Sequence, residues 1–257
     1  MHGGYAHGRI VNVDHHAKTV AMSRVVSSAN LALLRVRAVG LPPADAVVVI
    51  THTDCDSILS AGIMSGRLAA EDRYGDAAIA ADHTGDENAI ADLLQALDRY
   101  RDVELSLDAL MRLESGQPQT DAVAQKIAER RRKRDMAAEC VRDGGVVMQG
   151  DIAVGHLPHS LDGEFFAPLL PRAVVILLAM PHDEHPERLE VKLRLGHAAP
   201  AGFSMHDLHV ERFDFAHGGR WNAGSNRRGG GTTLRLDDYV ELLQSLVNER
   251  LAHLRTS

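Results

Sequence analysis

The chain has 257 residues, 45% of them hydrophobic, which is enough for one large or two modest globular domains with their own cores. Its formal net charge of -7 argues against a surface that wraps duplex nucleic acid, but leaves room for a small basic cleft. No segment approaches the roughly 20 apolar residues of a membrane span, and no secretory signal is recognisable, so we expect a cytoplasmic protein without a membrane partner. Cys55 and Cys140 are too few for a disulfide framework, which favours a reducing compartment.

Three short apolar runs in the first third of the chain lack the alternation of a half-buried strand. They therefore predict strands that are buried on both faces of a parallel sheet. Helical patterns separate the runs, and the first of these patterns begins with Ser27 or Ser28 as a cap and ends at Gly40. This order of strands and helices is typical of an α/β sheet. The apolar runs are residues 9–13, 46–50 and 77–81, and the helical patterns cover residues 27–43 and 57–72.

The pattern changes near residue 142, where long helical segments give way to strands separated by turns rich in Pro and His. We therefore expect a first domain over residues 1–140 and a second over residues 141–257. A charge run at residues 129–135 has no aromatic residues among its charges and is interpreted as a solvated helix face. The predicted helices are residues 87–114, 121–143 and 236–254, the last capped by Asp237, and the predicted strands are residues 146–154, 173–180 and 189–196.

Acidic and imidazole side chains follow each of the three apolar runs. Because the carboxyl ends of parallel strands meet at one edge of a sheet, we expect these side chains to converge there. Crowded carboxylates repel one another unless a cation compensates them, and mixed His and carboxylate sets favour Mn, Fe, Zn or Mg. A single Asp in such a place is as readily a turn or cap residue, but three similar ends together favour a metal site. The residues are Asp14, His15 and His16, then His52, Asp54 and Asp56, then Asp82 and His83.

A Gly-rich stretch, HGGRWNAGSNRRGGGT, covers residues 217–232. Paired glycines let backbone amides approach a phosphate. The planar guanidinium groups of Arg220, Arg227 and Arg228 can each bind a phosphate through two parallel hydrogen bonds. Trp221 could stack on a base and Asn222 could read its edge, which favours a substrate-binding role over a plain surface loop.

Several of these stretches resemble the DHH phosphoesterase superfamily. NVDHH, residues 12–16, resembles its Asp-His-His signature, and HTDCDSILSAG, residues 52–62, resembles its HxDxD motif followed by a helix start. ADHTG, residues 81–85, resembles either the motif that contributes a bridging Asp in manganese pyrophosphatases or the later Asp-Thr-Gly-like motif of the superfamily. VKLRLG with the Gly-rich stretch resembles the substrate-binding DHHA1 domain. The Asp-His-His motif stands first here, whereas it ordinarily follows HxDxD. We favour a circular permutation, while the loss of the first strands of the ordinary domain stays open.

The resemblance implies an α/β fold with a parallel-sheet DHH-type domain over residues 1–140, followed by a smaller mixed α/β DHHA1-like domain over residues 141–257. It also implies two divalent metal ions, Mn²⁺ in our expectation, whose bound hydroxide attacks phosphorus. The implied metal ligands are Asp14, His15, His52, Asp54, Asp56 and Asp82, and the implied catalytic residues are His15, His16 and Asp56. The implied substrate-binding residues are His83, His217, Gly218, Gly219, Arg220, Asn222, Asn226, Arg227 and Arg228.

The activity implied by the resemblance is a Mn-dependent hydrolase acting on a nucleotide-type phosphodiester or phosphomonoester. Short single-stranded oligonucleotides, dinucleotides and 3'-phosphoadenosine nucleotides are the expected substrates. Two alternatives stay open at this point, a manganese-type inorganic pyrophosphatase and a non-catalytic sensor that binds a nucleotide or a metal. The oligomeric state, including a homodimer, also stays open.

Overall fold

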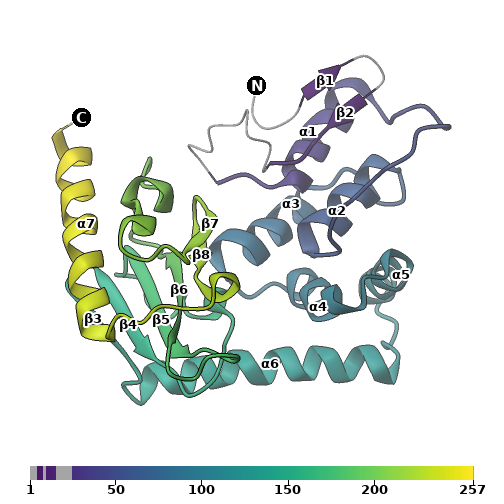
Figure 1. Cartoon of the computed structure of the whole chain (residues 1–257). Coiled ribbons are helices and arrows are strands. Elements are labelled where there is room, and N and C mark those ends of the chain that lie inside the picture. The colour runs from purple at the N-terminus through teal and green to yellow at the C-terminus, as the bar shows by residue number, and fades with distance from the viewer. Residues whose placement is uncertain (1–4, 8–9, 16–24, 257) are drawn as a thin grey trace. The chain divides into compact units, whose positions relative to one another are not determined.

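The protein is seen in a computed structural model that describes residues 5–7, 10–15 and 25–256 (Figure 1). The chain divides into two compact units, Met1–Arg132 and Lys133–Ser257. The division falls inside one helix, α6, which covers Asp121–Arg142, and lies eight residues before the boundary expected at 140. The fold is mixed α/β, with helices in the first unit and a six-stranded, mostly antiparallel sheet in the second.

The parallel sheet predicted for the first unit is absent from its described residues, and this prediction was wrong. Of the three apolar runs, only the first contains a strand, β2 (Ile10–Asn12), which pairs antiparallel with β1 (Tyr5–His7). Residues 46–50 are irregular, with Val47 and Val49 more than 80% exposed, because β1 and β2 pair only with each other and offer this segment no partner. Residues 77–81 are helical, as suits their four alanines, since alanine is the best helix former.

Local signals do explain the helices of the first unit. The side chain of Ser27 accepts a hydrogen bond from the backbone N–H of Asn30, and Asn30 Oδ1 accepts one from the backbone N–H of Ser27, so this capping box starts α1. Gly40, with φ of 80°, ends the same helix. The helices are α1 (Ser28–Val39), α2 (Cys55–Met64), α3 (Asp72–Ile79), the π-helix η1 (Ala80–Thr84), α4 (Ala89–Leu97), the short 3-10 turn η2 (Asp98–Tyr100) and α5 (Val103–Glu114).

The core of the first unit is centred on α2. Its side chains Ile58, Leu59 and Ile63 are fully buried and belong to a core cluster with residues of α1, α3, η1, α4 and α5. Full burial of such a side chain contributes about 1.5 to 3 kcal/mol. None of the helices in the described parts of the chain has the length and apolar character needed to cross a membrane.

The sheet of the second unit follows the predicted strands closely. Its order is β3-β4-β5-β6-β8-β7, and only β4 and β5 run parallel. The predicted strands of residues 173–180 and 189–196 are confirmed, whereas residues 146–154 form two antiparallel strands with a turn at residues 150–151 in place of one. The bounds are β3 (Val146–Gln149), β4 (Ile152–His156), β5 (Val175–Pro181), β6 (Leu189–Leu195), β7 (Gly218–Arg220) and β8 (Ala223–Ser225).

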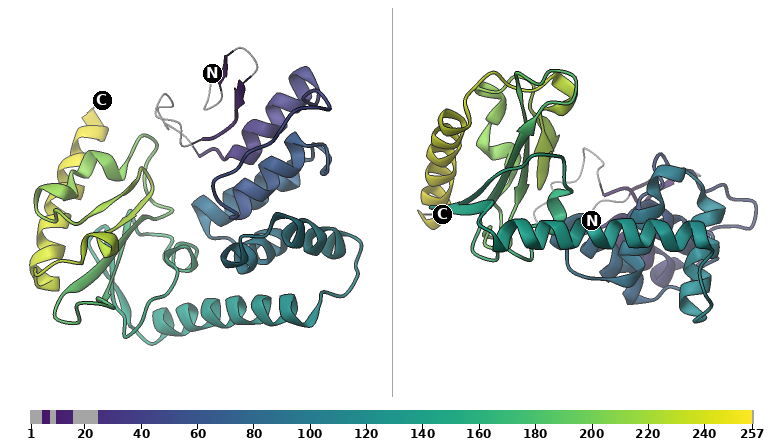
Figure 2. Two further views of the ribbon diagram at one scale, coloured as in Figure 1. Left: turned by 45° about the vertical axis from the view of Figure 1, so that its right-hand side comes forward. Right: turned by 90° about the horizontal axis from the view of Figure 1, so that it is seen from below.

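Each face of this sheet has its own layer, as Figure 2 shows. On one face, Val175 and Leu177 of β5 pack with α7 (Leu236–Thr256), whose Leu243 is fully buried. On the other face, Ile176 and Leu178 pack with the segment around the short turn η3 (Gly163–Phe165) and with α6. Helix α7 begins one residue before Asp237, so this residue lies in the first turn, where its charge suits the helix dipole.

A buried carboxylate joins three segments of the second unit. Asp214, 2% exposed, accepts hydrogen bonds from the Tyr239 hydroxyl at 3.0 Å and from the Asn226 amide at 2.9 Å. Asn226 in turn accepts from the backbone N–H of Val191 and donates to Leu189 O. The Gly-rich stretch is therefore fastened at its middle to both β6 and α7.

We expect Tyr239→Phe to lower the free energy of unfolding by about 1 to 3 kcal/mol, because a buried carboxylate loses one of its donors. Urea unfolding followed by circular dichroism measures the change. Tyr100→Phe is the matched control, since Tyr100 is 46% exposed and surface changes of this kind stay within about 0.5 kcal/mol. Equal stability of the Tyr239 and Tyr100 variants would contradict the role assigned to Asp214.

Candidate metal centre and anion-binding pocket

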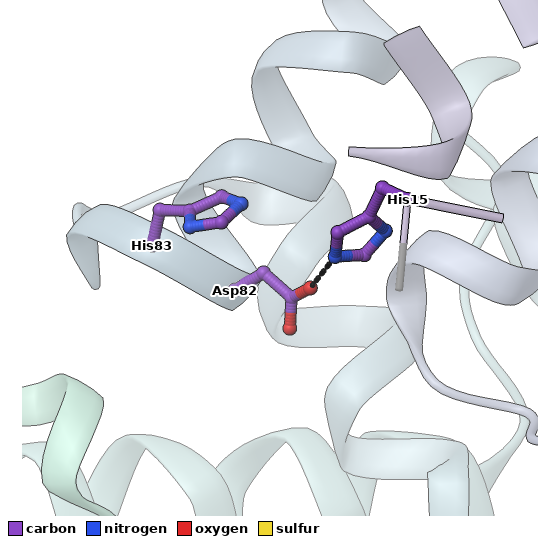
Figure 3. A group of neighbouring side chains, drawn as sticks. All are labelled: His15, Asp82 and His83. Carbon is purple, nitrogen blue, oxygen red and sulfur yellow. Dashed lines mark ion pairs between the residues drawn. The ribbon is translucent and has the colours of Figure 1, made fainter. Parts of the chain in front are cut away.

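Three buried side chains in the first unit, His15, Asp82 and His83, offer ligand atoms that all lie within 4.8 Å of one another (Figure 3). His15 follows β2, whereas Asp82 and His83 lie on η1. His15 Nε2 is 3.4 Å from Asp82 Oδ2, and the two imidazole centroids are 6.0 Å apart. This is the one group of at least three metal-binding side chains that meets this spacing within residues 5–7, 10–15 and 25–256.

The orientation of His15 depends on Asp56. His15 Nδ1 lies 3.0 Å from Asp56 Oδ2 and 2.8 Å from Ser28 Oγ. Asp56 is itself fixed, since it accepts hydrogen bonds from the backbone N–H groups of Ser28 at 2.9 Å and Ala29 at 2.7 Å. These amides belong to the first turn of α1, where a negative charge is favoured. The Nδ1 proton therefore points to Asp56, and Nε2 faces Asp82.

A backbone carbonyl orients His83 in a similar way. His83 Nε2 lies 3.0 Å from Val26 O, and a carbonyl can only accept, so the proton of a neutral imidazole is on Nε2. The nitrogen without a proton is then Nδ1. Hydrogen bonds of this kind commonly fix the tautomer of a metal-binding histidine. The five-residue π-turn that carries Asp82 and His83 is a form often found at functional sites, and it ends at Gly85, with φ of 74°.

The electrostatics of this group favour a cation. Burial raises the pKa of Asp54, hydrogen bonds from Ser57 oppose the shift, and the charges of Asp82 and Asp56 add to it. For His15, burial alone would lower the pKa, but hydrogen bonds to Asp56 and Asp82 and their charges outweigh it and raise the pKa to about 9. The carboxylates of Asp54, Asp56 and Asp82 thus repel one another in a largely buried site. Among these three acids and His15, only His15 supplies a positive charge.

The donor set fits a hard or borderline divalent ion. Imidazole and carboxylate ligands suit Mn, Fe, Zn or Mg, which agrees with the sequence expectation. The neighbouring thiol of Cys55 does not compete, because burial and the charges of Asp56 and Asp54 raise its pKa well above the usual value.

The predicted metal ligands fall into two groups in the structure. His15 contacts both Asp56 and Asp82. Asp54 caps α2 by accepting a hydrogen bond from the Ser57 N–H, and the charges of Asp82 and Asp56 raise its pKa. Asp14 and His52 are exposed and outside the three-residue group, and His52 Nδ1 instead lies 2.9 Å from Thr51 Oγ1. His83, predicted to bind substrate, lies in the metal group, while His16 lies outside the described residues.

We expect Asp82→Asn to weaken Mn²⁺ binding at least 10-fold, because it removes a charged donor from the three-residue group. Asp56→Asn should weaken binding about 10- to 100-fold through the lost orientation of His15. Isothermal titration of the metal measures both effects. Asp14→Asn is the matched control and should bind as the wild type does, so a comparable loss in this control would contradict the assignment of ligands.

A second feature is a pocket of about 620 Å³ on one face of the sheet in the second unit. Strand register explains it, because two cross-strand rows point to this face. One row is Ile176, Arg194, Ala223 and Arg220, and the other is Leu178, Lys192, Ser225 and Gly218. The remaining lining residues are Gly163, Leu193, Ala216, Gly219, Gly224 and Arg228.

Small residues leave this part of the face hollow, and basic residues surround it. Where β5 presents Ile176 and Leu178 to a packed layer, β7 and β8 present mainly Gly, Ala and Ser. A Cβ added at Gly219 would lie 2.3 Å from Gly224 Cα, so the close approach of β7 and β8 at this point requires a glycine at position 219. Among the residues that the structure describes, the charged side chains lining the pocket are Lys192, Arg194, Arg220 and Arg228, and none of the lining side chains is acidic. An anionic ligand fits this lining.

Arg227 and Arg228, though adjacent, have different surroundings. The Arg227 side chain forms an ion pair with Asp183, and its Nε lies 3.6 Å from Oε2 of the buried Glu190. The backbone carbonyl oxygen of Arg227 lies 2.9 Å from His182 Nε2. Arg228 lines the pocket and makes no ion pair or hydrogen bond within the described residues. Of these two predicted substrate-binding residues, Arg228 therefore lines the pocket, whereas Arg227 is engaged with acidic side chains of the protein.

The other predicted substrate-binding residues are placed as follows. Gly218, Gly219 and Arg220 line the pocket, and His217 packs beneath Gly224, where burial lowers its pKa. Asn222 and Asn226 are buried, and the amide of Asn226 is occupied by protein partners. Lys192 and Arg194 were missed, although their alternation in VKLRLG was the available signal.

Comparisons with known proteins give a limited result. No protein-family model matches the chain, and no curated protein matches its sequence. Its fold is similar to a pGpG-specific phosphodiesterase, PggH, from Vibrio cholerae, at 10% identity and a TM-score of 0.47, over 75% of this chain and 73% of that one. A second match is an exopolyphosphatase-related protein from Bacteroides fragilis, at 14% identity and a TM-score of 0.42, over 78% of this chain and 58% of that one. A third is an uncharacterized protein from Helicobacter pylori G27, at 16% identity and a TM-score of 0.27, over 76% of this chain and 52% of that one.

The chain thus spans only about half of the length of the last two proteins. All three TM-scores lie below 0.5, and we rest no inference about this chain on them.

Proposed function

We propose that the protein is a metal-dependent phosphoesterase that hydrolyses a nucleotide-type phosphodiester or phosphomonoester. The observation that carries this proposal is the oriented group His15, Asp82 and His83, backed by Asp56. A pocket lined by four basic residues in the second unit supports the choice of an anionic substrate. The residues that resemble the DHH and DHHA1 motifs support the same class.

The first unit would supply the chemistry. His15, Asp82 and His83 would hold a divalent ion, Mn²⁺ in our proposal, with Asp54 as the neighbouring carboxylate for a second ion. Bound divalent ions stabilise the charge on a phosphoryl group and lower the pKa of water. Asp56 keeps the Nδ1 proton of His15 in place, so that Nε2 stays available toward the group.

The second unit would supply affinity. Arg220 and Arg228 are planar donors that bind phosphate oxygens in pairs, and Lys192 adds a point charge. Ile176 and Leu178 form an apolar floor beside them. A pocket of about 620 Å³ with both kinds of lining suits a nucleotide better than inorganic pyrophosphate, which is smaller and has no apolar part.

We expect chelation to abolish hydrolysis of a chromogenic phosphodiester, and Mn²⁺ to restore it. The proposal requires turnover, whereas a nucleotide or metal sensor would bind without it. Absorbance of the released chromophore measures the rate. Full activity after removal of all metal, verified by elemental analysis, would overturn the proposal.

We expect Arg228→Ala to raise KM about 10- to 150-fold with little change in kcat, since a charge-assisted hydrogen bond contributes about 1.5 to 3 kcal/mol. Arg227→Ala is the matched comparison. It should mainly lower stability, because Glu190 is 1% exposed and loses a nearby positive charge. Steady-state kinetics and urea unfolding of both variants separate the two roles. A larger KM effect from Arg227→Ala would reverse the assignment.

A further inference from the structure

One aromatic side chain stands apart from all others of its type in the chain. Of the five Phe residues, Phe165, Phe166 and Phe203 are buried, and Phe213 packs edge-on against Tyr239 with ring centroids 5.0 Å apart. Phe215 is 90% exposed. An exposed side chain of this size forgoes a large part of the stabilisation that burial would give it.

The turn that carries Phe215 is held firmly. Its first residue is Asp214, the buried carboxylate that accepts from Tyr239 and Asn226. The Asp214 N–H donates to Val210 O at 3.0 Å, and the His217 N–H donates to Asp214 O at 2.9 Å, which closes the turn around Phe215. The ring is thus presented from a fixed backbone, so that little backbone entropy is lost when a ligand packs on it.

The turn also forms one edge of the basic pocket. Ala216, the next residue, lines the pocket, and a Cβ added at Gly229 would lie 2.6 Å from Ala216 Cβ. Gly229 follows Arg228, whose guanidinium is without a protein partner in the described part of the chain. Phe215 is not itself one of the lining residues, but it directly precedes Ala216, which lines the hollow together with Arg228.

Trp221, which the sequence suggested for base stacking, does not take this place. It is partly buried and packs with the core cluster on the α7 side of the sheet. Its neighbours in sequence, Arg220 and Asn222, show the alternation of a strand end, with Arg220 lining the pocket and Trp221 packed on the other side.

We infer that Phe215 stacks on the base of a nucleotide whose phosphate binds in the basic pocket. Sequence-tolerant recognition of nucleotides combines aromatic platforms for the bases with positive charge for the backbone, and both elements are present here. The inference rests on the proposed function and narrows its substrate class to nucleotides, because an inorganic phosphate chain has no ring to stack.

Two probes that differ only in the base test this inference. They are the non-hydrolysable phosphonate analogues of adenosine 5'-monophosphate and of ribose 5-phosphate, titrated into the full-length protein with Mn²⁺ present. Phe215→Ala should weaken binding of the adenosine probe about 5- to 150-fold and change binding of the ribose probe less than about 2-fold. Phe215→Trp should retain binding of the adenosine probe. Val147→Ala, at an exposed position of β3, is the control and should change neither.

Arg228→Ala separates the inference from the proposed function. Weaker binding of both probes to this variant, with an unchanged adenosine affinity for Phe215→Ala, would overturn the stacking role and leave the anion pocket standing. Equal losses of both probes in Phe215→Ala would also overturn it, because Phe215 would then support the turn alone. Unchanged binding of both probes in Arg228→Ala would instead refute the pocket on which the proposed function relies.

Discussion

The carboxylate of Asp56 is the contact on which the first unit depends. It accepts from two backbone amides at the start of α1 and from the imidazole of His15, so a single side chain fixes a helix terminus and a candidate ligand together. Burial of a charge is costly unless it is well paired, and these three donors offset that cost. Burial would raise the pKa of Asp56, but the hydrogen bond and the charge of His15 lower it, so Asp56 stays an acceptor.

Asp214 has the corresponding role in the second unit. It is also a buried carboxylate with its donors supplied by the protein, and it joins the Gly-rich stretch to α7 through Asn226 and Tyr239. In both units, then, the buried acid is occupied by protein donors. His15 Nε2 is directed toward Asp82 in the first unit, and Arg228 lines the pocket in the second.

The parts of this fold that follow from short segments were predictable from the sequence. The cap at Ser27, the stop at Gly40 and the alternating strands of the second unit depend on neighbours only a few residues away. The strands proposed at 46–50 and 77–81 were wrong because a short apolar run fits a buried strand or a helix equally well. The choice depends on a partner strand that no local pattern can reveal.

The candidate metal group was predicted in part, and from a premise that the structure corrects. Strand ends in a parallel sheet were expected to gather the acids, yet Asp54 and Asp56 are gathered by the start of α2, and Asp82 and His83 by a π-turn. The place of His83 beside His15 and Asp82 could not be inferred from the sequence, because it depends on a hydrogen bond to Val26 O, a contact across 57 positions. For Lys192 and Arg194, alternation in the sequence predicts one shared strand face, but strand register is needed to show that this face also carries Arg220.

This correction also bears on the order of the motifs. An acid at a helix start is aimed by its own capping geometry, and a residue on a π-turn is aimed by that turn, so neither needs a fixed place in a sheet. The site also needs α1 and α2 to pack together, because the amides of Ser28 and Ala29 must reach Asp56. In addition, η1 must bring Asp82 to His15 and His83 to Val26 O. These contacts do not by themselves fix whether residues 12–16 or residues 52–62 must come first in the chain. Convergence at this site is thus a property of local caps and turns and of the packing between them.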